Sequence, residues 1–120
     1  MESQRIVATP LKTRVTELLG CDYPVLQTGM GWVATPKLVA AACNAGAFGF
    51  LAAATIPPNE VEGAILEIKE LTDRPFGVNF LMDAPGADVI SQAIIRQGVR
   101  AAGYNRAPSA ELIQSLKDGG

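Results

Sequence analysis

The sequence has 120 residues, with no histidine and only two cysteines, Cys21 and Cys43. Histidine is the side chain most often used as an acid or base near neutral pH, so any proton transfer must use another group or a group outside these residues. Two cysteines without metal-ligand spacing also supply too few ligands for a zinc site. We therefore predict no metal site and interpret both cysteines as reduced, packed thiols.

A surplus of basic residues is missing too, because 10 Lys and Arg residues stand against 12 Asp and Glu residues, for a net charge of -2. Neither a nucleic acid nor an anionic membrane surface is expected as a partner. No apolar run approaches the roughly 20 residues that cross a bilayer, and residues 1–10 lack the apolar centre of a signal peptide. We predict a soluble, cytoplasmic protein with a flexible tail over residues 1–10 and one domain over residues 11–120.

What the sequence does contain is a regular alternation of β-favouring and helical segments. After a short helix over residues 11–19, apolar runs alternate with segments whose apolar residues recur at helical spacing. The predicted strands cover residues 23–30, 48–54, 76–82 and 99–104, and the predicted helices cover residues 36–45, 60–71, 87–97 and 109–117.

Such a succession of βα units, with no sign of an antiparallel hairpin, fits either an open doubly wound sheet or a (β/α)8 barrel. A doubly wound nucleotide-binding domain would place Gly-x-Gly-x-x-Gly at the start of a helix. Here Gly29-Met-Gly-Trp-Val-Ala34 has alanine in the third glycine position, and Thr35-Pro36 starts the helix late. This motif therefore favours the doubly wound sheet only weakly.

Three separated segments resemble the nitronate monooxygenase family, formerly called 2-nitropropane dioxygenases. They are Tyr23-Pro-Val-Leu-Gln-Thr-Gly-Met-Gly-Trp-Val-Ala34, Asn44-Ala-Gly-Ala-Phe-Gly-Phe50 and Leu71-Thr-Asp-Arg-Pro-Phe-Gly-Val-Asn79. The same arrangement is found in FMN-dependent enoyl-acyl-carrier-protein reductases and in a flavin reductase of steroid-ring degradation. The resemblance extends over residues 11–120. It implies an α/β fold that forms the first four βα units of a (β/α)8 TIM barrel, with FMN across the carboxyl ends of the strands.

The resemblance also implies which residues face the cofactor. Gly29, Met30 and Gly31 would lie against the flavin ring, because glycine has no Cβ to collide with a flat ring and methionine offers polarizable contact. Asn79 is an amide in an otherwise apolar strand and needs a partner, which the resemblance identifies as the flavin. Gln27 is a weaker candidate, since its side chain can equally bond to neighbouring backbone.

Other residues have two open interpretations each. Trp32, the sole tryptophan, either forms a wall of the substrate pocket or packs between a loop and a helix. Thr28 either faces the cofactor or bonds to backbone. Asn105 follows the fourth predicted strand and could approach cofactor or substrate, although a turn residue is the favoured interpretation.

The activity implied by the resemblance is that of an FMN-dependent oxidoreductase of the nitronate monooxygenase type, which oxidises a nitronate-like or related small organic substrate with oxygen. One alternative is an NAD(P)H-dependent flavin reductase that acts on an enoyl or ring-degradation CoA thioester. An IMP-dehydrogenase-like barrel is more distant, because it would need a nucleophilic cysteine elsewhere. A different class of alternative is a non-catalytic half-barrel that forms a homo-oligomer through its uncovered sheet edges.

Two features of the family are absent from the sequence. The family holds the FMN phosphate with glycine-rich loops after later strands, and it has a Gly-Gly-His type segment associated with catalysis; neither occurs here. We therefore expect the N-terminal half of a longer protein, with no catalytic residue of its own. The 120 residues by themselves are expected to bind FMN poorly and to turn over no nitronate.

Overall fold

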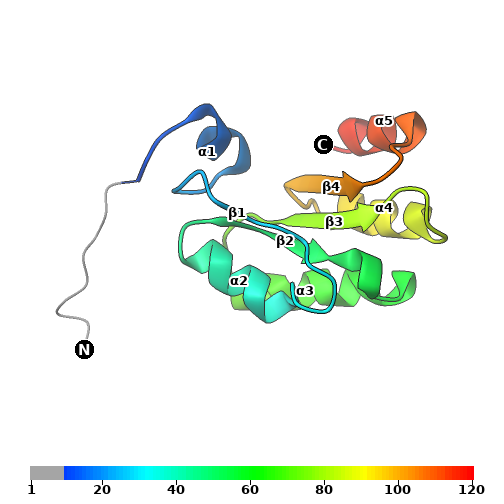
Figure 1. Cartoon of the computed structure of the whole chain (residues 1–120), viewed down its shortest axis with the longest axis horizontal. Helices are drawn as coiled ribbons and strands as arrows, with labels where there is room; N and C mark the ends of the chain where they lie inside the picture. The colour runs from blue at the N-terminus through cyan, green and yellow to red at the C-terminus, as the bar shows by residue number, and fades with distance from the viewer. Residues whose placement is uncertain (1–9) are drawn as a thin grey trace.

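A computed structural model describes residues 10–120 (Figure 1). Residues 1–9, nearly all of the predicted tail, lie outside the described residues. The strands are β1 (Leu26–Gln27), β2 (Phe48–Ala52), β3 (Gly77–Leu81) and β4 (Ala101–Asn105). The helices are α1 (Arg14–Leu19), α2 (Pro36–Asn44), α3 (Val61–Leu71), α4 (Ala87–Arg96) and α5 (Ala110–Asp118), with short 3-10 turns η1 (Ala53–Thr55) and η2 (Pro58–Glu60).

The four strands form one parallel sheet in the order β1-β2-β3-β4, and the arrows of β2, β3 and β4 run in the same direction in Figure 1. Each strand pairs with the next one along the chain, so the order never reverses as it does at the switch point of a doubly wound sheet. Successive helices also pack on one another, α2 on α3, α3 on α4 and α4 on α5. This is the arrangement of the first four βα units of a (β/α)8 barrel, as the sequence predicted.

The hydrophobic core lies between this helix layer and one face of the sheet. Alternate residues of a strand point to opposite faces, so Leu51, Val78 and Phe80 meet the helices and are fully buried. The helices contribute a matching set of buried apolar side chains: Val39, Val61, Ile65, Ile68, Ile90 and Ile94. The opposite face of the sheet, which does not pack against these helices, is called the inner face below.

Two phenylalanines of β2 cover part of the inner face. Phe48 and Phe50 meet edge to face, with ring centroids 5.2 Å apart. A Cβ at Gly77, on the neighbouring strand, would lie 2.4 Å from Phe50 Cε1. Glycine at this position therefore lets the Phe50 ring lie across β3.

The first strand is much shorter than the predicted range of residues 23–30. Pro24 has no N–H to donate, and the backbone N–H groups of Asp22 and Tyr23 both donate to Gly46 O instead of forming a ladder. Phe48 N donates to Val25 O at 2.9 Å, so the segment still follows β2. Beyond Gln27 the chain leaves the sheet.

The first helix also differs from its prediction. Thr13 and Thr16 form a reciprocal capping box, so the helix begins at Arg14 and excludes Leu11. Its apolar residues do not form a buried stripe, because Val15 and Leu18 are exposed and Thr16 is the buried residue of the helix. The next helix starts at Pro36 as predicted, and Thr35 precedes it as the N-cap residue, but the Thr35 side chain makes no capping hydrogen bond.

Polar contacts fasten the amino ends of the strands. Arg74 Nη2 lies 2.6 Å from Asp22 Oδ2 and lowers the pKa of that carboxyl. The Cys43 thiol donates to Pro75 O at 3.4 Å and accepts from Gly49 N, and burial raises its pKa. A buried thiol that resists ionisation is a packing group, which agrees with the interpretation from sequence.

We predict that Glu62 on α3 titrates far below ordinary glutamates. Hydrogen bonds from Arg96, at 2.7 Å, and Gln97, at 2.9 Å, lower its pKa from 4.5 to about 2. Because the folded-state pKa is depressed, this stabilisation is present above pH 4.5 and is lost as the pH falls toward about 2. A carboxyl-carbon NMR titration measures the pKa directly.

The variant Arg96→Met should return the Glu62 pKa toward its ordinary value and move acid unfolding to higher pH. Arg14→Met, which removes an equal charge from an exposed position on α1, is the control and should leave Glu62 unchanged. A Glu62 that titrates near 4.5 in the unmodified chain would contradict the assigned network.

Candidate functional site

An open hollow of about 400 Å³ lies on the inner face, at the carboxyl ends of β1, β3 and β4. Its lining residues are Leu26, Thr28, Gly29, Phe50, Asn79, Gly103, Tyr104 and Asn105. Barrel enzymes keep their active sites at this end of the strands, because the loops that follow the strands converge there.

Asn79 is at the centre of this hollow. Its strand neighbours in register are Ala52 of β2 and Gly103 of β4. A Cβ at Gly29 would lie 2.8 Å from Asn79 Cβ, and one at Gly103 would lie 2.8 Å from Asn79 Oδ1. The Asn79 side chain therefore occupies a slot that any larger residue at either glycine would close.

Gly29 and Gly31 are needed for close packing of the loop after β1, which the sequence alone did not show. Gly29 brings the loop after β1 against Asn79, and a Cβ at Gly31 would lie 2.9 Å from Thr55 Cγ2. Their predicted contact with a flavin ring stays a prediction, whereas the close approach of the loop to β3 and η1 is what the described residues show.

The loop after β1 folds into a tight turn at the rim of the hollow. Val33 N and Ala34 N both donate to Met30 O, and Trp32 N donates to Thr55 Oγ1 at 3.1 Å. Trp32 has a φ of 60°, which is uncommon for a residue with a side chain. With 83% of its surface exposed, Trp32 does not pack between loop and helix as one interpretation held. Its role as a pocket wall stays a prediction, and Met30 is likewise partly exposed.

Gln27 is placed differently from the other candidates. It is in register with Gly49, and the latter faces Val39 of α2, so the Gln27 side chain lies on the helix side of the sheet. Its Nε2 donates to Phe50 O at 3.1 Å and to Thr28 O. Gln27 therefore bonds to backbone and does not line the hollow, while its Oε1 is buried without a partner among the described residues.

The structure also identifies residues that sequence reasoning missed or ranked low. Asn79 Nδ2 donates to Asn105 Oδ1 at 2.6 Å, so Asn105 belongs to the site and is more than a turn residue. Phe50 and Gly103 complete the surroundings of this pair. The available signal was that Asn79 is a polar residue in a predicted strand and that Asn105 directly follows the next predicted strand along the chain.

The chemistry of the hollow is neutral and suits one side of a flat ring with a polar edge. Asn79 Oδ1 and Asn105 Nδ2 have no hydrogen-bond partner among residues 10–120, which leaves one acceptor and one donor available. Leu26 and Phe50 supply apolar surface beside them. Arg106 borders this site but pairs with Asp83 at 3.1 Å. The lining therefore fits a heteroaromatic ring better than a phosphate.

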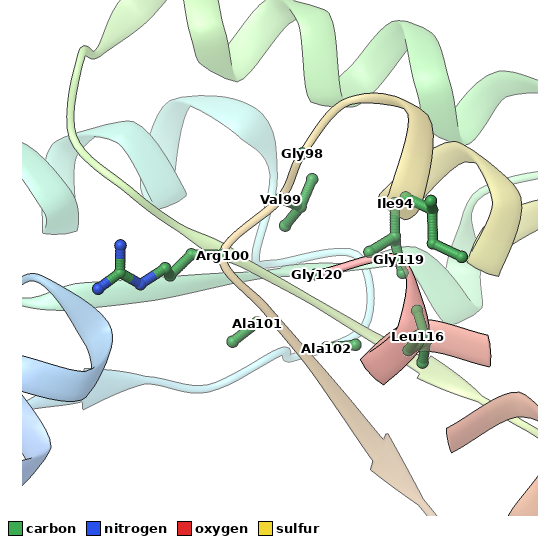
Figure 2. A pocket seen from close by; sticks show the side chains of 10 residues that line it. Ile94, Gly98, Val99, Arg100, Ala101, Ala102, Leu116, Gly119 and Gly120 are labelled. Carbon is green, nitrogen blue, oxygen red and sulfur yellow. The ribbon is translucent and has the colours of Figure 1, made fainter. Parts of the chain in front are cut away.

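A second hollow, of about 90 Å³, lies between α4, β4 and α5 and is shown in Figure 2. Ile94, Val99 and Leu116 border it, and the guanidinium of Arg100 points away from it. Arg100 Nε donates instead to Leu18 O at the end of α1. This hollow is a packing gap at the sheet edge without convergent polar groups.

Other kinds of site have no support in the described part of the chain. Residues 10–120 contain no cluster of three or more His, Cys, Asp or Glu side chains that could hold a metal ion. None of their helices is both long and apolar enough to cross a membrane.

Fold and site together define part of a (β/α)8 barrel with an amide pair at the carboxyl ends of its strands. The sequence profile described as nitronate monooxygenase matches residues 12–114. The chain belongs to the nitronate monooxygenase family.

Individual relatives cover a range of activities. The chain is 52% identical, over 92% of its length, to a Rhodococcus jostii protein named (3aS,4S,5R,7aS)-5-hydroxy-7a-methyl-1-oxo-octahydro-1H-indene-4-carboxyl-CoA dehydrogenase, of which it covers 31%. It is 43% identical, over 60% of its length, to a probable nitronate monooxygenase of Staphylococcus saprophyticus, of which it covers 20%. The chain thus spans about a third of the length of these curated relatives or less.

Solved structures agree with the fold. FabK from Thermotoga maritima has a TM-score of 0.87 and 35% identity, with 92% of this chain and 35% of that chain covered. Nitroalkane oxidase from Streptomyces ansochromogenes has a TM-score of 0.78 and 27% identity, with 90% and 40% covered.

We predict that Gly29→Ala destabilises the chain by about 1–3 kcal/mol, the usual result of overpacking, because the new Cβ would lie 2.8 Å from Asn79 Cβ. Gly63→Ala is the matched control. Gly63 lies on α3 with nothing within 4 Å of an added Cβ, so alanine there should stabilise the helix by about 0.5–1 kcal/mol. Urea unfolding measures both, and equal effects would show that no slot exists at Gly29.

Proposed function

We propose that the chain forms the N-terminal wall of the flavin site in an FMN-dependent oxidoreductase, and that Asn79 binds the flavin ring. The observation that supports this most directly is the Asn79 slot between Gly29 and Gly103, with an unused acceptor facing an open hollow. Membership of the nitronate monooxygenase family supports the same conclusion.

The chain's own residues would bind and orient the ring. Asn79 Oδ1 would accept a hydrogen bond from a ring N–H, while Asn105 Oδ1 accepts from Asn79 Nδ2. Leu26 and Phe50 would exclude water from one side. The bound flavin itself would supply the electron-transfer chemistry.

For the substrate, we propose a ring-bearing acyl-CoA thioester. The dehydrogenase relatives from Rhodococcus jostii and Mycobacterium tuberculosis share 52% and 49% identity over 92% of this chain. A nitronate oxidised with oxygen is the second candidate, favoured by the family description and by the Staphylococcus saprophyticus relative with 43% identity.

We predict that the full-length product of the gene that encodes these residues binds one FMN. Asn79→Ala should weaken FMN binding by about fivefold, as expected for one hydrogen bond of about 1 kcal/mol. Flavin fluorescence quenching gives the dissociation constant, and Asn59→Ala, an exposed asparagine on η2, is the control.

Residues 1–120 expressed by themselves should bind FMN much more weakly, because no lining residue can hold its phosphate. If the full-length product binds no FMN in any preparation, the proposed function is wrong. A colourless oligomer would instead support the alternative of a self-associating, non-catalytic half-barrel.

The substrate class is decided by steady-state assays of the flavin-loaded protein. We predict turnover of a hydroxylated or unsaturated ring acyl-CoA thioester, measured with NAD⁺ or NADH, and little oxygen consumption with a nitronate. Oxygen uptake with a nitronate but no reaction with any thioester would reverse the order of the two candidates.

A further inference from the structure

We propose that Asn105 is a positioning residue that sets which way the amide of Asn79 faces. This inference rests on the proposed function, in which Asn79 binds the flavin. The observation behind it is the 2.6 Å hydrogen bond from Asn79 Nδ2 to Asn105 Oδ1 across the inner face of the sheet.

The glycine slot fixes the position of the Asn79 side chain, but it does not determine which of the two amide atoms, Oδ1 or Nδ2, points to which side. Gly29 and Gly103 restrict Cβ and the terminal atoms from two sides. An asparagine amide that turns over by half a rotation exchanges a donor for an acceptor with almost no change in shape. A flavin ring edge has donors and acceptors at fixed positions, so the two orientations of Asn79 would bind it differently.

Asn105 can select one of these orientations because its backbone is fixed by β3 and by the loop that follows β4. It is the last residue of β4, in register with Leu81 of β3. The next residue, Arg106, has a φ of 65° and pairs with Asp83, which ties the loop after β4 to the loop after β3. The Asn105 side chain therefore projects from a fixed strand end over Gly103, where a Cβ would be 2.8 Å from Asn79 Oδ1.

In the observed arrangement, Asn105 occupies the donor side of Asn79 and leaves Oδ1 as the atom available to a ligand. A ligand with a ring N–H can therefore bond to Asn79 Oδ1.

Two substitutions at this position test the assignment. Asn105→Ala removes the partner, and we expect FMN to bind about fivefold more weakly to the full-length product, the effect of one lost hydrogen bond. Asn105→Asp keeps an acceptor for Asn79 Nδ2 and can only hold the observed orientation, so FMN binding should stay within about twofold of the unmodified protein. Weaker binding in Asn105→Asp than in Asn105→Ala would overturn the assigned orientation.

A double-mutant cycle separates positioning from direct contact. If Asn105 acts through Asn79, Asn105→Ala should add almost no further loss of FMN affinity once Asn79 is alanine. Additive losses would overturn the proposal, since Asn105 would then contact the ligand independently or act only on the fold. An Asn79→Ala variant that binds FMN as tightly as the unmodified protein would instead overturn the proposed function.

A flavin-free measurement completes the test. The side-chain NH₂ of Asn79, observed by ¹⁵N NMR in the full-length protein without FMN, should exchange with solvent more slowly than that of the exposed Asn59. Asn105→Ala should abolish this protection and Asn105→Asp should preserve it. Unchanged exchange in Asn105→Ala would overturn the positioning role whatever the flavin does.

Discussion

The register of β3 with its two neighbours is the constraint that the other features of the site depend on. Asn79 is aligned with Ala52 on one side and Gly103 on the other, and all three strands run in the same direction. Because consecutive strands pair without a reversal, their carboxyl ends meet at one edge and their helices form one layer. A shift of β3 by one residue would turn Asn79 toward the helices and Val78 toward the hollow. Register therefore determines both the core and the site.

Much of this could be predicted from the sequence, because it depends on local patterns. Helical spacing and glycine or proline boundaries identified each β-strand and α-helix of residues 10–120, although the bounds of β1 and α1 differ, and the amide of Asn79 stood out in an apolar strand. Contacts between distant side chains could not be predicted in this way. The bond between Asn79 and Asn105 spans 26 residues, and the close approach of Gly29 to Asn79 depends on how a loop folds back. The two interpretations of Trp32 could not be separated from the sequence for the same reason, since its exposure follows from the turn around Met30.

The two ends of the sheet differ in chemistry. At the amino ends, charged and polar contacts such as Asp22 with Arg74 and Arg100 with Leu18 hold α1 and the strand starts together. At the carboxyl ends, the lining of the hollow contains no Asp, Glu, Lys or Arg side chain. This division is typical of barrels, in which one end serves stability and the other serves the site. It also explains why Cys43, with its raised pKa, belongs to the stabilising end.

The lining of the hollow has no charged side chain, which limits what this part of the barrel can contribute to a reaction. The amides of Asn79 and Asn105 do not ionise in the pH range in which proteins fold, so the hydrogen bond between them does not depend on their protonation. They can orient a ring and select its edge, but they cannot transfer a proton. The absence of histidine from the sequence is consistent with this division of labour. In the proposed function, acid-base chemistry therefore has to come from the substrate, the cofactor or residues outside the hollow, while the glycine slot and Asn79 would orient the ring.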